Sequence, residues 1–194
     1  YRQADLQVLH GHQIFWIHAV SVGEVRASFP LIKSLKRQFP ESRIVLSGMT
    51  FTGHQVALTA GGVDLAVFFP FDLSFIVKRA LRTINPELIV IIETEIWPNF
   101  IRLAKDSGIP LVLANGRISR KSFPRYLFFK RCLKPILGNF SAIYMQDAEC
   151  ARRIRALGAP ATLVKVTGNM KFDLPLTTPD LDDLLENKTL RPLL

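Results

Sequence analysis

A glutamate that is able to act as a general base, Glu24, closes the short segment Ser21-Val22-Gly23-Glu24. A carboxylate in this setting can accept the proton of an attacking hydroxyl group, which contributes roughly 10²–10⁴-fold to a rate. Gly23 beside it permits a tight turn or the close approach of a ligand. The same segment is typical of a helix start, where the helix dipole favours a carboxylate by about 0.3–1 kcal/mol. Taken alone, the segment leaves catalysis and helix stabilisation both open.

Two further acids, Glu93 and Glu95, directly follow the apolar run 88–92. Acids beside a buried strand are costly, because desolvation of a carboxylate raises its pKa and lowers stability. Their position favours a functional site, with Glu95 in contact with substrate. The alternative is a pair of structural acids bonded to Arg117, Lys171 or backbone amides.

Lys171 follows the last predicted strand and can bind a phosphate or carboxylate as a point charge, although a solvated surface lysine is the plainer interpretation. His18 is expected to be a hydrogen-bonded core residue, whereas His54 is placed where it can contact a ligand. The remaining candidate substrate contacts are all small or polar and follow predicted strand ends. They are Ser21, Gly23, Thr52, Gly53, Glu95, Asn115, Arg117 and Asn169.

The elements that must position these residues alternate strictly between strands and helices. Apolar runs rich in β-formers predict strands at Ile14–Val20, Arg43–Gly48, Leu65–Phe69, Leu88–Glu93, Leu111–Asn115, Ala142–Gln146 and Val164–Gly168. Amphipathic stretches predict helices at Val25–Phe39, Gly53–Ala60, Leu73–Ile84, Asn99–Ser107, Phe123–Leu137 and Ala148–Leu157. Because several strands are apolar on both faces, we predict an α/β fold with a Rossmann-like, doubly wound parallel sheet. Its ligand cleft is expected at the carboxyl ends of the strands.

The 194 residues are predicted to form one domain over 1–173, and 174–194 is predicted to be a linker leading into a second domain. Pro30 is expected to kink the first helix or to mark an irregular turn. The two cysteines lie far apart and outside any metal-binding spacing, so neither a metal nor a disulfide is expected. The apolar runs are about strand length, far short of the ~20 residues of a membrane span. The chain begins without methionine, which leaves open whether it is a fragment with an anchor upstream.

The formal net charge of +9 favours an anionic partner. Seven cations and no acid lie between Arg117 and Lys134. The aromatic and apolar residues among them predict a membrane-facing amphipathic surface, with a solvated helix face as the alternative. These residues are Phe123, Tyr126, Leu127, Phe128 and Phe129. No nucleic-acid motif accompanies the charge, and the fingerprints of dinucleotide-binding, P-loop, serine-hydrolase and zincin proteins are absent from the sequence.

Five motifs follow one another along the chain, and they are His18-Ala19-Val20-Ser21-Val22-Gly23-Glu24, Pro70-Phe71-Asp72, Glu93-Thr94-Glu95-Ile96-Trp97-Pro98-Asn99, Asn115-Gly116-Arg117-Ile118-Ser119 and Thr167-Gly168-Asn169-Met170-Lys171-Phe172-Asp173. Taken in order, they resemble those of the bacterial 3-deoxy-D-manno-octulosonic acid (Kdo) transferases, which build the inner core of lipopolysaccharide. The resemblance covers about residues 14–173. It implies a GT-B glycosyltransferase with two Rossmann-like domains, of which this chain is the amino-terminal, acceptor-binding half.

The resemblance further implies inverting transfer of Kdo from CMP-Kdo to lipid IVA, a lipid A precursor, at the cytoplasmic face of the inner membrane and without a cofactor. By position, Glu24 matches the proton acceptor, and Glu93 and Lys171 match residues that stabilise the transition state. The implied partners are CMP-Kdo, held mostly by the second domain, lipid IVA and the anionic membrane surface. On this basis the chain by itself is expected to be inactive.

Two alternatives remain open from the sequence. One is another GT-B enzyme, such as a nucleotide-sugar epimerase or a different lipid-linked sugar transferase. The other is a non-catalytic module that docks on anionic lipid through its basic surface. The sequence fixes neither the number of Kdo residues transferred nor the oligomeric state.

Overall fold

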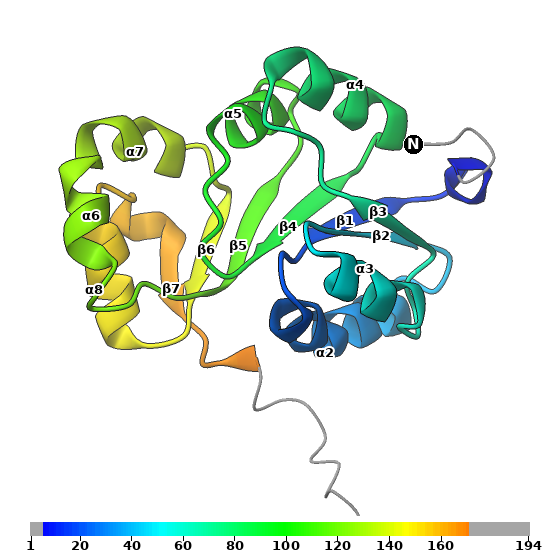
Figure 1. Cartoon of the computed structure of the whole chain (residues 1–194), viewed down its shortest axis with the longest axis horizontal. Coiled ribbons are helices and arrows are strands. Elements are labelled where there is room, and N and C mark those ends of the chain that lie inside the picture. The colour runs from blue at the N-terminus through cyan, green and yellow to red at the C-terminus, as the bar shows by residue number, and fades with distance from the viewer. Residues whose placement is uncertain (1–5, 171–194) are drawn as a thin grey trace, which may run out of the picture.

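The computed structural model describes residues 6–170, in which parallel strands form one sheet in the order β3-β2-β1-β4-β5-β6-β7 (Figure 1). The strands are β1 (Ile14–His18), β2 (Arg43–Gly48), β3 (Leu65–Phe68), β4 (Leu88–Ile92), β5 (Leu111–Gly116), β6 (Ala142–Met145) and β7 (Val164–Val166). The helices are α2 (Val22–Gln38), α3 (Phe51–Leu58), α4 (Ser74–Ile84), α5 (Pro98–Asp106), α6 (Phe123–Phe128), α7 (Lys130–Leu137) and α8 (Ala148–Ala156), with short 3₁₀ turns at η1 (Gln7–Leu9) and η2 (Ala161–Leu163).

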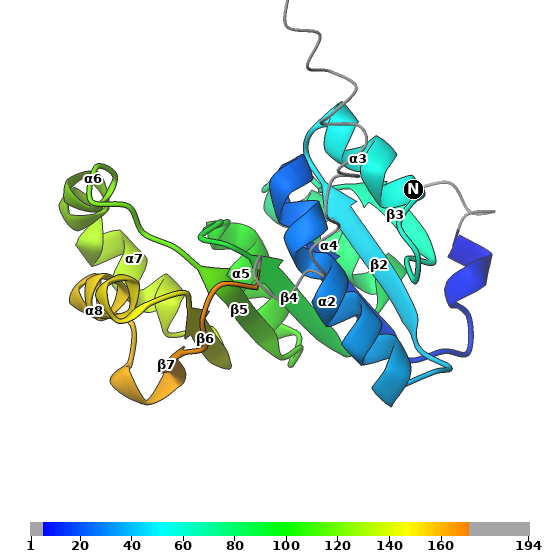
Figure 2. The same ribbon diagram turned by 90° about the horizontal axis from the view of Figure 1, so that it is seen from below.

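The helices form layers on both faces of the sheet, and two hydrophobic clusters fill the space beneath them (Figures 1 and 2). Strand β4 contributes to both clusters, because successive side chains of a strand point to opposite faces of the sheet. Ile89 and Ile91 join the cluster that includes α4, α5, α7 and α8, whereas Val90 and Ile92 join the cluster beneath α2 and α3. The predicted Rossmann-like, doubly wound parallel sheet is therefore confirmed.

Each predicted strand is present, with ends that differ by at most a few residues, but one predicted helix is wrong. The stretch Phe123–Leu137 forms two helices, α6 and α7, which meet at Phe129. The backbone N–H of Phe129 bonds to the carbonyl of Tyr126, three residues back, at 3.1 Å. This tighter turn interrupts the four-residue bonding pattern that one continuous helix needs.

A proline lies inside helix α2, and glycines follow the ends of helices α5 and α8. Helix α2 runs without interruption through Pro30, so the predicted irregular turn is not found there. Gly108 and Gly158 follow α5 and α8 with positive φ angles of 73° and 109°, as expected of helix-ending glycines. Among the described residues, no helix has the length and apolarity required to cross a membrane.

Candidate active site

Glu24 lies in the first turn of α2, directly after β1, and its side chain is buried at 9% exposure. One carboxylate oxygen accepts a hydrogen bond from the backbone N–H of Val20, and the other accepts one from the hydroxyl of Ser21, both at 2.8 Å. The Ser21 oxygen in turn accepts the N–H of Glu24, so the pair closes the helix start as a capping box does. Helix stabilisation by Glu24 is therefore real. A carboxylate is also able to take up a proton, so the catalytic role of Glu24 stays a prediction beside this structural one.

Gly23 and Gly53 lie in the first turns of α2 and α3. Gly23 lies inside α2 without a positive φ, so the tight-turn interpretation is wrong. Its surface is open, because an added Cβ would meet only the Ser21 hydroxyl, at 3.8 Å. Gly53 is buried, and a Cβ there would come within 2.7 Å of the Thr50 hydroxyl that caps α3. We conclude that Gly53 fits α3 against the loop after β1, while the neighbouring Thr52 is exposed in the first turn.

The loop after β4 carries Glu93 and Glu95, both half-buried. Glu93 adopts a left-handed backbone conformation (φ 62°), which is strained for a residue with a side chain. Between them, the hydroxyl of Thr94 donates to the carbonyl of Arg117 at 2.7 Å and accepts its N–H at 2.9 Å. Arg117 thus holds this loop through its backbone, and its side chain is exposed.

Asn115 joins the ends of three strands. It is 1% exposed and left-handed (φ 57°) at the end of β5. Its side-chain oxygen accepts the backbone N–H of Met170 after β7 at 3.1 Å, and its carbonyl accepts the side-chain amide of Gln146 after β6 at 3.0 Å. Asn115 therefore acts first as a joint between loops. Asn169 lies half-buried beside this joint, and Lys171 lies outside the described residues.

Three carboxylates, those of Glu24, Glu93 and Glu95, come together at this edge of the sheet. Burial, followed by the charges of Glu24 and Glu93, raises the pKa of Glu95 to about 7. Near neutral pH, Glu95 is therefore partly protonated and able to donate a hydrogen bond. Within residues 6–170, no group of three or more His, Cys, Asp or Glu side chains is placed to hold a metal ion.

The raised pKa of Glu95 predicts a pH dependence of stability. The folded state holds this proton more tightly than the unfolded chain, whose carboxyl has an ordinary pKa of 4.5. The free energy of unfolding should therefore fall as the pH rises from about 4.5 to about 7. Glu95→Gln keeps the shape of the neutral form, so it should raise the melting temperature more at pH 8 than at pH 5. An equal shift at both pH values would contradict the assignment.

An aromatic layer lies beneath these loops. The ring of His18 is buried and stacks on Phe69 with centroids 3.8 Å apart, and Phe69 packs on Trp97 at 5.3 Å. The Nδ1 atom of His18 lies 3.1 Å from the hydroxyl of Ser47, and burial lowers the pKa of His18 to about 3, so the ring is neutral. The prediction of a hydrogen-bonded core histidine is confirmed. His54 instead stacks on the exposed Phe68, with centroids 4.4 Å apart.

The basic stretch 117–134 is only partly outward-facing, which corrects the expected membrane surface. Phe123 and Tyr126 pack against the core. Burial and the charge of Glu95 raise the pKa of the Tyr126 hydroxyl, which places this ring beside the carboxylates. Leu127, Phe128 and Phe129 are exposed, at 40%, 83% and 51%. Tyr126 is thus a site neighbour that the sequence did not indicate, because helix periodicity alone cannot show that α6 turns one ring towards the sheet edge.

A parallel sheet in this order, with polar loops at its carboxyl edge, defines a Rossmann-like domain whose ligand site is expected at that edge. The fold is similar to that of UDP-GlcNAc 2-epimerase from Neisseria meningitidis bound to UDP-GlcNAc, with a TM-score of 0.61 and 12% identity over 91% of this chain and 53% of that one. It is also similar to Anabaena HepE in complex with UDP and glucose, with a TM-score of 0.57 and 17% identity over 81% and 44% of the two chains. At these identities the likeness concerns the fold alone.

Residues 2–174 match the sequence profile of the family described as 3-deoxy-D-manno-octulosonic-acid transferase (kdotransferase), and the chain belongs to this family. A 3-deoxy-D-manno-octulosonic acid transferase of Haemophilus influenzae is 37% identical over 163 residues, which cover 84% of this chain and 38% of the relative. One of Chlamydophila psittaci is 35% identical over 160 residues, covering 81% and 37%. The chain therefore spans well under half the length of these relatives. The family predicted from the five motifs is confirmed.

Proposed function

We propose that this chain is the acceptor-side half of an enzyme that transfers Kdo from CMP-Kdo to lipid IVA in lipopolysaccharide biosynthesis. The observation that carries this proposal is the group of three carboxylates at the carboxyl edge of the sheet, in a chain that belongs to the Kdo transferase family. Glu24 serves as the base that takes the proton of the acceptor hydroxyl as it attacks the anomeric carbon of Kdo, while CMP leaves with the electron pair of the broken bond. The second domain, expected beyond residue 173, supplies most of the CMP contacts.

Glu93 and Lys171 are proposed to stabilise the transition state, and the partly protonated Glu95 to donate a hydrogen bond to the acceptor. The proposed substrate contacts lie around the carboxyl edge of the sheet, and they are Ser21, Gly23, Thr52, Arg117 and Asn169. Gly53 and Asn115 support the site by fixing its loops, because their buried contacts are made within the protein. The enzyme is proposed to work at the cytoplasmic face of the inner membrane, where the exposed residues of α6 and their neighbouring cations contact anionic lipid.

The test is an assay of the longer protein that contains both domains, with CMP-Kdo and lipid IVA as substrates. The product masses then give the number of Kdo residues added. We expect one or more Kdo additions and none by residues 1–194 alone. The likeness in fold to UDP-GlcNAc 2-epimerases makes epimerisation the second candidate, so UDP-GlcNAc is included as a substrate. Epimerisation without Kdo transfer, or full transfer by the 194-residue chain, would overturn the proposal.

A further inference from the structure

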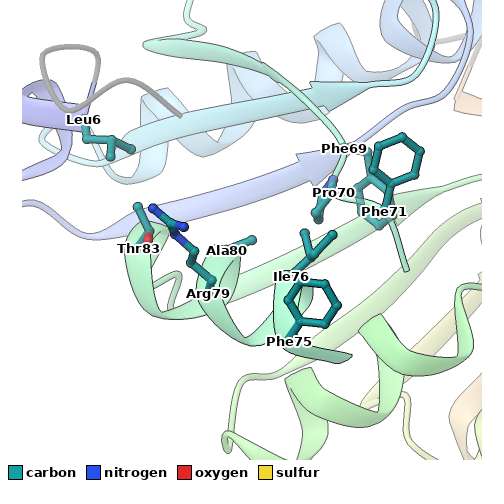
Figure 3. A pocket seen from close by; sticks show the side chains of 9 residues that line it. All are labelled: Leu6, Phe69, Pro70, Phe71, Phe75, Ile76, Arg79, Ala80 and Thr83. Carbon is teal, nitrogen blue, oxygen red and sulfur yellow. The ribbon is translucent and has the colours of Figure 1, made fainter. Parts of the chain in front are cut away.

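A groove of about 760 Å³ runs along α4, outside the carboxylate site (Figure 3). Its volume falls within the roughly 300–1,000 Å³ of ligand pockets. The loop after β3 forms one wall with Phe69 and Phe71, and α4 forms the other with Phe75, Ile76 and Arg79. Figure 3 shows Phe71 and Phe75 at one end of the groove and Arg79 towards the other. The groove therefore combines an aromatic end with a cationic one.

The aromatic end is more exposed than core packing requires. Phe71 is 80% exposed, Phe75 71% and Leu73 52%, although the opposite side of α4 buries Val77 and Leu81 in the core. Neighbouring exposed rings on a soluble domain mark a surface that contacts something apolar. The core-facing side of α4 is thus already packed, and the exposed rings of Phe71 and Phe75 lie outside that core contact.

The charges of this surface are of one sign. Helix α4 carries the exposed cations Lys78, Arg79 and Arg82 and no acid. The acids that flank it already have partners. Asp72 accepts the backbone N–H groups of Asn99 and Phe100. Glu87 accepts the side-chain amide of Gln13. Exposed aromatic residues beside basic residues on a helix are typical of surfaces that lie on an anionic lipid layer.

A second copy of the chain does not fit this surface. An isologous contact would place the cations of α4 against those of the partner, and like charges facing each other oppose association. Anionic lipid matches both the cations and the exposed rings of this surface, because headgroup phosphates can pair with the cations while acyl chains cover the rings.

We propose that α4 and the loop 69–73 form a lipid-docking surface, with an acyl chain of an anionic membrane phospholipid in the groove and its phosphate at Arg79. This inference deepens the proposed function and rests on it for the identity of the acceptor. The surface is joined to the site, since Asp72 fixes the start of α5 directly after the carboxylate loop, with distances of 3.1 Å to Asn99 N and 2.7 Å to Phe100 N. Docking there brings the carboxylates to the membrane plane, where a lipid acceptor presents its sugar.

The experiment is co-sedimentation of the 194-residue chain with vesicles of phosphatidylglycerol and phosphatidylcholine, and with vesicles of phosphatidylcholine alone. We expect binding to the anionic vesicles, roughly tenfold weaker binding for Phe71→Ser/Phe75→Ser, and a loss of about fivefold for each of Arg79→Glu and Arg82→Glu. Leu58→Ser on α3, where the residue is 58% exposed, is the apolar control, and Lys33→Glu on α2 is the charge control. Both controls should bind more strongly than the α4 variants, and melting curves confirm that every variant is folded.

Equal losses in the controls and the α4 variants, or equal binding of the wild-type chain to neutral vesicles, would overturn the inference. A dimer in solution that Phe71→Ser/Phe75→Ser converts to a monomer would also overturn it, because the groove would then be an interface between copies. The assay contains neither CMP-Kdo nor lipid IVA. A failed transferase assay with intact, α4-dependent vesicle binding would therefore refute the proposed function alone.

Discussion

Glu24→Gln in the longer, two-domain protein is expected to lower Kdo transfer by roughly 10²–10⁴-fold while lipid IVA binding is retained. The amide oxygen of the glutamine can accept the N–H of Val20, and its NH₂ group can donate to the Ser21 hydroxyl, so both bonds at the start of α2 keep a partner. What the variant loses is the capacity to take a proton. The turnover number should therefore fall, with little change in acceptor affinity.

The matched control is Glu149→Gln, which alters another glutamate in the first turn of a helix. Glu149 pairs with Arg152 and Arg153 at the surface of α8, so its loss should leave turnover unchanged. Near-normal turnover of Glu24→Gln would show that Glu24 serves only the helix start and that the base is another residue.

The largest effect on stability is expected from Phe100→Ala. Phe100 is fully buried in α5, and its ring lies 5.1 Å from that of Trp16 and 4.8 Å from that of Phe69, measured between centroids. Truncating a buried phenylalanine costs about 3–5 kcal/mol, because apolar contact is lost and a cavity is left. This is a large part of the roughly 5–15 kcal/mol by which a domain is stable.

Urea unfolding of the 194-residue chain measures this loss as a lower midpoint. Phe128→Ala is the control, since a ring that is 83% exposed should change the free energy of unfolding by no more than about 0.5 kcal/mol. A loss below about 1 kcal/mol for Phe100→Ala would mean that the aromatic layer is not packed as described. Because this layer lies beneath the carboxylate loop, the same variant in the longer protein should also lose activity.

The fold follows from features that are local in the sequence. The apolar run of β4 and the amphipathic segment of α4 can each be recognised alone, since burial on one or two faces imposes a period on the side chains. Gly108 and Gly158 end their helices through backbone conformations that other residues rarely adopt. The break at Phe129 was missed because it depends on how α6 and α7 pack, and periodicity within 123–137 carries no sign of it.

Some features of the candidate site can likewise be read from the sequence, and others depend on the tertiary structure. The sequence by itself determined the family and the residues that are capable of acid–base chemistry, because motif order and side-chain type are written in the chain. Only the tertiary structure decided that Glu95 stands beside Glu24 and Glu93, that Tyr126 turns inward, and that Asn115 joins three strand ends. Those facts depend on distances between segments far apart in sequence, and a pKa is set by the burial and the charges that such distances create.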